Sequence, residues 1–470
     1  MTFFSFKPHT LDSKHVTLAL GLAVISLGQA LQHGNGYLNS TSLFFLTLSL
    51  VFLGWAFFFP TTFGDKFFAK TTFSFLLLGL LLQIFQLSFL YFGDSEFLSL
   101  LPNFWQFRIE TLAAGTLAII HLALYKKLST KWNNVLTVLV LLILWFSGVW
   151  LIKNIPYPFI DVFVFQQNSG DALLKGVNPY TLSTPNIYGD KYIYGYGAEL
   201  IQDGVLTIGN PYPPLSIYVS SLGYFLGGDV RYSHLVAFLA SGALMAFFHP
   251  GRMSKLAAYL FLFMPKSFYV LEQSWTEPIV VMFFMLAVYT AVHCPRWAPI
   301  MVGLFFASKQ YLIFVFPLVL WLFPLRKPFG AWLRSYANIV LAALLVTVPL
   351  ALWNFPAFLW NVGEAQWYQI FRLDALSYLA AYARVTDVQP SQLVAFVLLG
   401  LAFFMAWYFI PQTPEGFSSA FAWCLILFFA FNKQAFCNYY FLVIGALCAT
   451  LAMLSSKLSS NLLKQEVSVV

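Results

Sequence analysis

Few side chains in this chain are charged, and those that could do chemistry fall in five short polar motifs between apolar stretches. The motifs are Asp161, Glu272-Gln-Ser-Trp-Thr-Glu277, Ser308-Lys309-Gln310-Tyr311, Arg372 with Asp374, and Asn432-Lys433-Gln-Ala-Phe-Cys-Asn438. An acid beside a membrane can take a proton from a hydroxyl nucleophile, and Lys and Arg can hold a phosphate that leaves with negative charge. This division of labour predicts the transfer of a group from a lipid phosphate.

The composition predicts a membrane protein with many spans. Of the 470 residues, 60% are hydrophobic and 9% are charged, whereas soluble domains carry roughly 25% charged residues. The net charge of +7 does not indicate nucleic-acid binding, because cytoplasmic loops of membrane proteins are rich in Lys and Arg. The four cysteines form no CxxC pair and the seven histidines form no HExxH motif. We therefore predict no metal site built from protein ligands.

The apolar stretches predict an all-α polytopic protein of about 14 membrane segments, because a span needs about 20 apolar residues. The stretches 212–227 and 298–325 are ambiguous, and the positive-inside rule decides between the options. We place 212–227 at the outer surface and read 298–325 as two short helices that meet at Lys309, with both chain termini in the cytoplasm. This topology turns three cations to the cytoplasm: Arg252, Lys255 and Arg296. The other segments are 15–32, 41–60, 72–92, 110–125, 133–153, 231–249, 255–271, 278–294, 332–353, 392–410, 417–431 and 437–455.

This topology divides the chain into three parts and brings the polar motifs to the outer face. Residues 1–131 form an N-terminal membrane extension of four helices, residues 132–456 form the core, and residues 457–470 form a cytoplasmic tail. The core has two long outer loops, 154–212 and 354–391. Each loop is long enough for amphipathic helices that lie in the membrane interface.

A distributed set of motifs between residues 133 and 455 carries a family resemblance. The motifs are Asp161 after an apolar helix, Ala172-Leu-Leu-Lys-Gly-Val-Asn-Pro-Tyr180, Tyr212-Pro-Pro-Leu215, Trp275-Thr-Glu-Pro278 and Lys309-Gln-Tyr311. Together they resemble the GT-C superfamily of membrane glycosyltransferases. Within it, the chain looks like the mannosyltransferase-like group of glycosyltransferase family eighty-seven and its relatives, which use polyprenyl-phosphate sugars. The resemblance leaves the four N-terminal helices unexplained.

The resemblance implies a GT-C-like helical bundle that works as a hexosyltransferase. Its donor would be a polyprenyl-phosphate sugar, mannose or another hexose, and its acceptor a hydroxyl of a glycan, lipid or protein. An acid in the first outer loop acts as general base in this family, and that role maps to Asp161. The sugar would leave the lipid phosphate with inversion at the anomeric carbon. Because the first loop lacks the paired acids of the family pattern, Asp171 stays open as the base, although an acid there also suits the start of a helix.

The other polar side chains are expected to bind the substrates. Lys309 and Arg372 are expected to hold the phosphate, with an internal ion pair to Asp374 as the alternative for Arg372. One of Glu272 and Glu277 is expected to orient the sugar or the acceptor. Further substrate-binding candidates are Asp171, Gln310, Lys433 and Asn438. No cofactor is predicted, and a divalent cation bound through the substrate phosphate stays open.

Two other functions remain open from the sequence. A lipid or polysaccharide transporter (a flippase) suits the many spans, but transporters bury ionisable residues near the bilayer midplane, and here the candidates gather at one surface. An inactive relative that binds a lipid-linked sugar would carry the same motifs. In each case we expect a multi-pass protein of the bacterial cytoplasmic membrane with its site facing outside.

Overall fold

The computed structural model describes Leu11 and residues 13–59, 65–90, 104–189, 196–324 and 329–467, and for 65–70 and 455–467 the description covers the backbone. The chain is mostly helical, and its described strands form one small antiparallel sheet of order β1-β3-β2. The strands are β1 Thr184–Pro185, β2 Ile201–Gln202 and β3 Val205–Leu206.

Seven helices in the described ranges are long and apolar enough to cross a membrane, judged by length and composition. They are α1 Lys14–Gln32, α2 Ser40–Phe58, α3 Asp65–Phe89, α4 Phe104–Leu124, α5 Thr130–Asn154, α14 Phe329–Trp353 and α19 Cys437–Val467. Shorter apolar helices accompany them: α11 Glu277–His293, α12 Ala298–Ala307, η5 Gln310–Leu318 with α13 Val319–Leu322, α17 Leu393–Phe409 and α18 Pro414–Ala430. These helices confirm an all-α protein of membrane type, while the count of about 14 segments stays a prediction.

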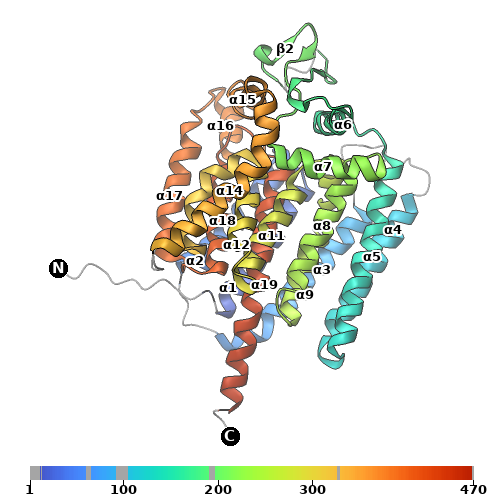
Figure 1. Cartoon of the computed structure of the whole chain (residues 1–470). Coiled ribbons are helices and arrows are strands. Elements are labelled where there is room, and N and C mark those ends of the chain that lie inside the picture. Colours follow the sequence, from blue (N-terminus) through green and yellow to red (C-terminus); the bar gives the residue numbers. More distant parts are fainter. Residues whose placement is uncertain are drawn as a thin grey trace, which may run out of the picture.

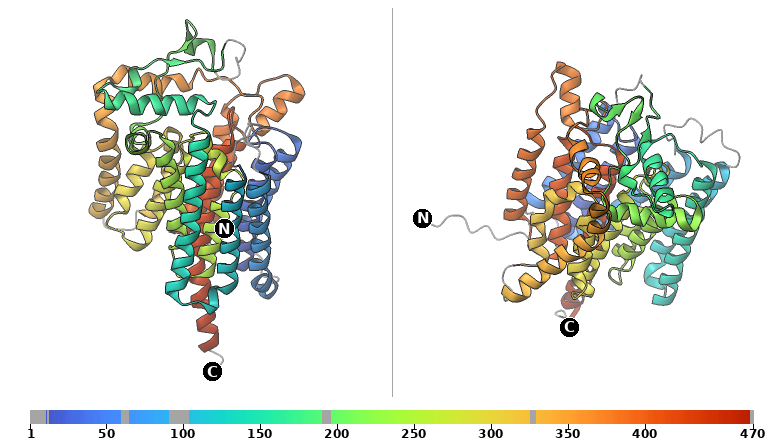
Figure 2. Two further views of the ribbon diagram at one scale, coloured as in Figure 1. Left: turned by 90° about the vertical axis from the view of Figure 1, so that its right-hand side faces the viewer. Right: turned by 45° about the horizontal axis from the view of Figure 1, so that its top comes forward.

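The long helices run side by side, and shorter elements lie across one end of the bundle (Figures 1 and 2). We call this the capped end. Its elements are α6 Asp161–Leu174, α7 Pro214–Gly227, α15 Phe355–Val362, α16 Tyr378–Thr386, η3 Pro179–Thr181, η4 Ala198–Leu200, η6 Glu364–Gln366 and the small sheet. Residues 212–227, which the sequence places at the surface, therefore form a helix across the bundle end.

The second long loop, 354–391, contains helices because two side chains cap them. Asn354 accepts a hydrogen bond from Ala357 N at the start of α15, and Ser377 accepts one from Ala380 N at the start of α16. Such caps satisfy backbone N–H groups that the first turn of a helix leaves without partners. The helices predicted for the two long loops are thus present as α6, α15 and α16.

Two of the apolar stretches are broken, one as predicted and one not. The predicted break at Lys309 is confirmed: α12 ends at Ala307, Lys309 is extended with φ −153° and ψ 135°, and η5 follows. The stretch 255–271 is predicted as one segment, and that prediction is wrong. It splits into α9 Arg252–Leu262 and α10 Ser267–Glu272 around Pro265, because proline lacks the N–H that would continue the first helix.

The helix α19 forms the centre of the bundle and supports the capped end. Its apolar part, Cys437–Leu454, is almost entirely buried. It packs against α18, α9, α11 and, from the N-terminal helices, α1. Between α7 and α9 the chain forms α8 Arg231–Ala246, and η2 Tyr125–Lys127 follows α4. Because α19 begins at the capped end, its first turn lies beside the loops there.

Candidate functional site

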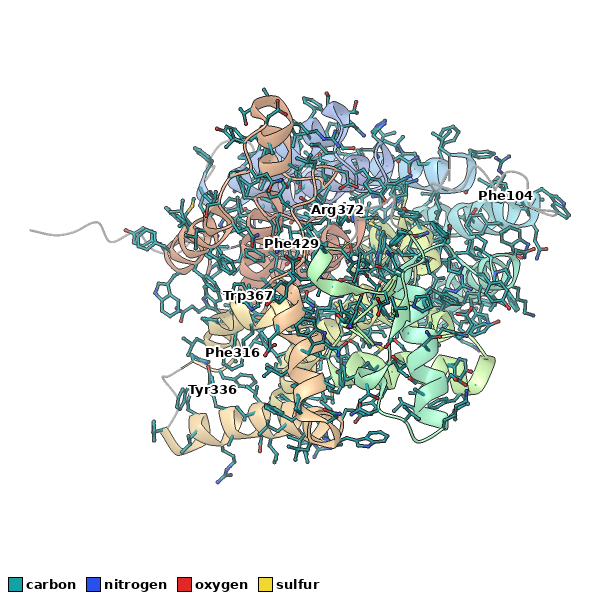
Figure 3. All side chains as sticks on the ribbon, turned by 90° about the horizontal axis from the view of Figure 1, so that it is seen from above. Phe104, Phe316, Tyr336, Trp367, Arg372 and Phe429 are labelled. Carbon is teal, nitrogen blue, oxygen red and sulfur yellow. The ribbon has the colours of Figure 1, made fainter. Side chains whose placement is uncertain are left out.

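A cavity of about 1410 Å³ lies at the capped end. Its walls come from the start of α6, the Lys309 break, the loop between α15 and α16, the helices α17 and α18, and the first turn of α19. Figure 3 looks onto this end, with Arg372, Trp367 and Phe429 near the middle of the view. Seven of the nine predicted site residues line the cavity: Asp161, Glu272, Lys309, Gln310, Arg372, Lys433 and Asn438.

Asp161 begins α6, and its carboxylate is held on both oxygens. Oδ1 accepts a hydrogen bond from Val162 N at 2.7 Å, and Oδ2 accepts one from the hydroxyl of Tyr196. The hydroxyl of Tyr188 accepts a hydrogen bond from Asp161 N at 3.3 Å. Burial raises the pKa of Asp161, and the hydrogen bond from Tyr196 opposes that rise. A carboxylate with a raised pKa is a stronger base. It can still accept a proton, because it is ionised at any pH above its pKa.

Asp171 lies on the same helix but does not line the cavity. Its carboxylate pairs with Lys175 at 2.5 Å, one turn along α6, and both side chains are exposed. The hydroxyl of Tyr224 donates to its other oxygen at 3.4 Å. The substrate-binding role assigned to Asp171 thus finds no support in its position, and of the two candidate bases only Asp161 reaches the cavity.

Lys309, which lines the cavity, forms a buried ion pair with Glu277, which does not line it. The Nζ of Lys309 lies 2.9 Å from Glu277 Oε1, and the two side chains are 5% and 0% exposed. The ammonium also donates to Thr276 Oγ1 at 2.7 Å and lies 4.3 Å from the ring centre of Tyr212. Glu277 is not among the lining residues, so its position suits the orientation of Lys309 rather than contact with a sugar. An ammonium has three donors, so one remains for a ligand.

Arg372 forms the ion pair that the sequence allowed as an alternative. Its Nε and Nη2 donate to the two carboxylate oxygens of Asp374 at 2.8 and 2.6 Å. The guanidinium carbon lies 4.8 Å from the ring centre of Phe436. Burial alone would lower the pKa of Arg372, but the hydrogen bond and charge of Asp374, with smaller contributions from two tyrosines, leave the pKa raised. Three of the five N–H groups of an arginine remain for a ligand in this arrangement.

The other predicted side chains are fixed by neighbouring backbone or lie buried in the wall. Lys433 donates to the carbonyl of Gln369 at 2.7 Å, and burial lowers its pKa. Gln310 donates to the carbonyl of Pro211 at 3.1 Å. Asn438 lies in the first turn of α19, and Glu272 ends α10; both side chains are buried.

Sequence reasoning missed several residues of this cavity. Tyr188 and Tyr196 belong to a tyrosine-rich stretch, Tyr188-Gly-Asp-Lys-Tyr-Ile-Tyr-Gly-Tyr196, and that enrichment is a usable signal. Asn35 and Tyr37, from the loop between α1 and α2, also line the cavity. Nothing in their local sequence marks them.

One flank of the cavity is apolar. Phe314 of η5, Phe396 of α17 and Phe428 of α18 line it, with ring centres 5.2, 5.4 and 5.8 Å apart. Phe314 and Phe396 are 41% and 42% exposed, so much of the apolar surface of this flank is accessible. We call these three residues the phenylalanine flank. The cavity therefore joins a polar end at Asp161 to an apolar side between helices.

No family model, curated protein or solved structure matches the chain. The similarity to GT-C glycosyltransferases therefore rests on the motifs of the sequence. Among the residues that the structure describes, no group of three or more His, Cys, Asp or Glu side chains could hold a metal ion. That finding concerns protein ligands, so a cation bound through a substrate phosphate stays open.

Proposed function

We propose that the chain is a membrane glycosyltransferase that moves a hexose from a polyprenyl-phosphate carrier to an acceptor hydroxyl. The observation that carries the proposal is the shared cavity. It holds a half-buried acid, Asp161, together with Lys309, Arg372 and Lys433 from three separate parts of the chain. A base and several cations around one space suit a reaction in which a proton is removed and a phosphate leaves.

In the proposed reaction the acceptor oxygen attacks the anomeric carbon of the sugar. A new glycosidic C–O bond forms while the bond from the anomeric carbon to the phosphate oxygen breaks. Asp161 takes the proton of the acceptor hydroxyl, and the polyprenyl phosphate leaves with the electron pair of the broken bond. Attack from the face opposite the phosphate inverts the anomeric configuration. No redox partner or nucleotide is required.

Lys309, Arg372 and Lys433 are proposed to hold the phosphate. All three residues line the cavity, and a partner holds the charged group of each: Glu277, Asp374 and the carbonyl of Gln369. Fixed donors stabilise developing negative charge without having to reorganise during the reaction. Arginine adds a planar fork that suits phosphate oxygens.

The phenylalanine flank is proposed to receive the polyprenyl chain of the donor. A lipid-linked substrate needs an apolar path from the membrane to a polar reaction centre, and Phe314, Phe396 and Phe428 provide apolar surface beside the cations. Burying aromatic and isoprenoid surface from water stabilises such a complex by about 25 cal/mol per Å².

The charge pattern supports a site at the outer face. Arg252 lies where α9 begins, away from α6 and α7 (Figure 1), and its Nε donates to the carbonyl of Leu122 at the end of α4. Cytoplasmic helix ends carry an excess of Arg and Lys. The capped end with its cavity then faces the exterior of a bacterial cytoplasmic membrane.

Membranes that contain the protein test this proposal with polyprenyl-phosphate mannose and polyprenyl-phosphate glucose, each labelled in the sugar. We expect the labelled sugar of one donor to be transferred to an acid-stable product in which the anomeric configuration is inverted. Free polyprenyl phosphate should remain as the second product. Binding of the donors without any cleavage would support the transporter or the inactive relative instead. Vesicles that lack the protein are the control.

A further inference from the structure

The loop between α1 and α2, residues 33–39, reaches from the N-terminal helices into the capped end. Leu38 N donates to the carbonyl of Asp374 at 2.8 Å, and Tyr37 forms an isolated antiparallel bridge with Ala375. Arg384 of α16 donates to the carbonyl of Leu38 at 3.3 Å. The loop therefore pairs with the backbone directly after Arg372, the residue whose side chain faces the cavity.

Gly36 fixes this loop against the start of α19. Its φ is +85°, a conformation that favours glycine. A Cβ added there would lie 2.2 Å from the backbone nitrogen of Cys437 and 2.7 Å from its Cα. Backbone atoms at the start of a buried helix cannot move aside cheaply, so only glycine fits. By contrast, a Cβ on Gly54 of α2 would meet its nearest atom at 3.9 Å, which is ordinary van der Waals contact.

Tyr37 packs against the ring that lies beside Arg372. Its ring centre is 5.7 Å from that of Phe436, the ring that also supports the guanidinium of Arg372. Tyr37, Arg372 and Asp161 line the same cavity. The aromatic ring of Tyr37, rather than its hydroxyl, is therefore the group that supports Phe436 beside the guanidinium.

We propose that Tyr37 is a positioning residue that, together with Phe436, holds Arg372 toward the cavity. The N-terminal helices α1 and α2 then belong to the functional unit, because they present the loop that carries Tyr37. The identity of the ligand that Arg372 binds, a lipid phosphate, rests on the proposed function. The positioning of the guanidinium does not depend on it.

Chemical labelling tests the positioning without any substrate. The purified full-length protein in detergent is treated with phenylglyoxal, which modifies accessible guanidinium groups, and labelling of Arg372 is followed by mass spectrometry. We expect Tyr37→Ala and Gly36→Ala to label Arg372 several-fold faster than the wild type. Tyr37→Phe, which keeps the ring on Phe436, and Gly54→Ala are expected to match the wild type. The exposed Arg334 of α14 is the internal reference.

Donor kinetics test the consequence for the proposed reaction. We expect Tyr37→Ala to raise the KM for the polyprenyl-phosphate sugar several-fold with a smaller change in kcat, because Arg372 would bind the phosphate in both ground and transition states. Tyr37→Phe should recover the wild-type KM. A purely structural defect would lower the amount of active protein and reduce kcat without this split.

The outcomes separate the two proposals. Equal labelling of Arg372 in the wild type and in monodisperse Tyr37→Ala overturns the positioning role, whatever the activity of the protein. If Gly36→Ala does not yield folded protein, Tyr37→Ala and Tyr37→Phe decide the question alone. Faster labelling with no turnover of any donor by the wild type upholds the positioning role and overturns the proposed function.

Discussion

Asp161 derives its proposed chemistry from the place where α6 begins. A helix N-terminus favours negative charge, but burial in the capped end disfavours it, and burial is the larger effect on the pKa. The hydrogen bond from Tyr196 partly restores the ionised form. Burial and the hydrogen bond thus leave Asp161 with a raised pKa, at a position where its carboxylate lines the cavity.

The hydrogen bond from Tyr196 sets the acidic side of the pH profile. Tyr196→Phe removes a bond that lowers the pKa of Asp161, so the pKa should rise further. Since the base works in its ionised form, activity is lost as pH falls through that pKa, and the acidic limb of kcat/KM should move to higher pH. Tyr224→Phe, which alters the neighbour of Asp171 instead, should leave the profile unchanged. An identical limb in both variants would contradict the role of Asp161 as base.

The two acids of the first outer loop look alike in the sequence, and helix geometry separates them. At 3.6 residues per turn, ten residues place Asp171 about 80° around α6 from Asp161 and about 15 Å along it. One carboxylate therefore reaches the cavity while the other meets Lys175 in solvent. The sequence could identify Asp161 and Lys309 as candidates because charge beside apolar stretches is costly. The sequence could not show which partners hold these two side chains.

At the scale of elements, the break between α12 and η5 places Lys309 at the cavity. An extended residue between two short helices turns its ammonium toward Glu277 at the start of α11. This break follows from the sequence, because a lysine within an unbroken apolar span would be costly. The break between α9 and α10 was not predicted, although Pro265 and the charged Lys266 beside it mark the stretch in the same way that Lys309 marks the other one.

The buried pair of Lys309 and Glu277 should show strong energetic coupling. Lys309→Met leaves the carboxylate of Glu277 buried without its counter-charge, and such a change costs about 3–5 kcal/mol. The double variant Lys309→Met with Glu277→Gln removes both charges and should recover most of this loss. Thermal unfolding in detergent measures the difference. A single variant as stable as the double variant would show that the two side chains are not paired.

At the scale of the whole molecule, the cavity combines surfaces that lie far apart in the chain. The phenylalanine flank draws on η5, α17 and α18, and the lining also includes Tyr37 from the loop between α1 and α2. The sequence indicated helices for most of these segments from their apolar composition. It could not show that residue 37 meets residue 375, because no local pattern records a contact across such a separation.

The phenylalanine flank predicts a dependence on the length of the lipid. Phe396→Ala removes part of the apolar surface that is proposed to hold the polyprenyl chain. The KM for long-chain donors should therefore rise by about three- to tenfold, which corresponds to the loss of one aromatic contact. Short-chain donors should be little affected. Phe404→Ala is the matched control, since Phe404 lies on the same helix, is 68% exposed and does not line the cavity. Equal effects of both variants would place the lipid elsewhere.

The most direct test of Asp161 as the base compares Asp161→Asn with Asp171→Asn in transfer of labelled hexose from polyprenyl phosphate. Both replacements remove one carboxylate from α6, and both proteins should reach the membrane in wild-type amounts. We expect Asp161→Asn to lose about 10²–10⁴-fold in kcat, the usual contribution of a general base, while Asp171→Asn keeps wild-type turnover. Full transfer by Asp161→Asn would show that Asp161 is not the base.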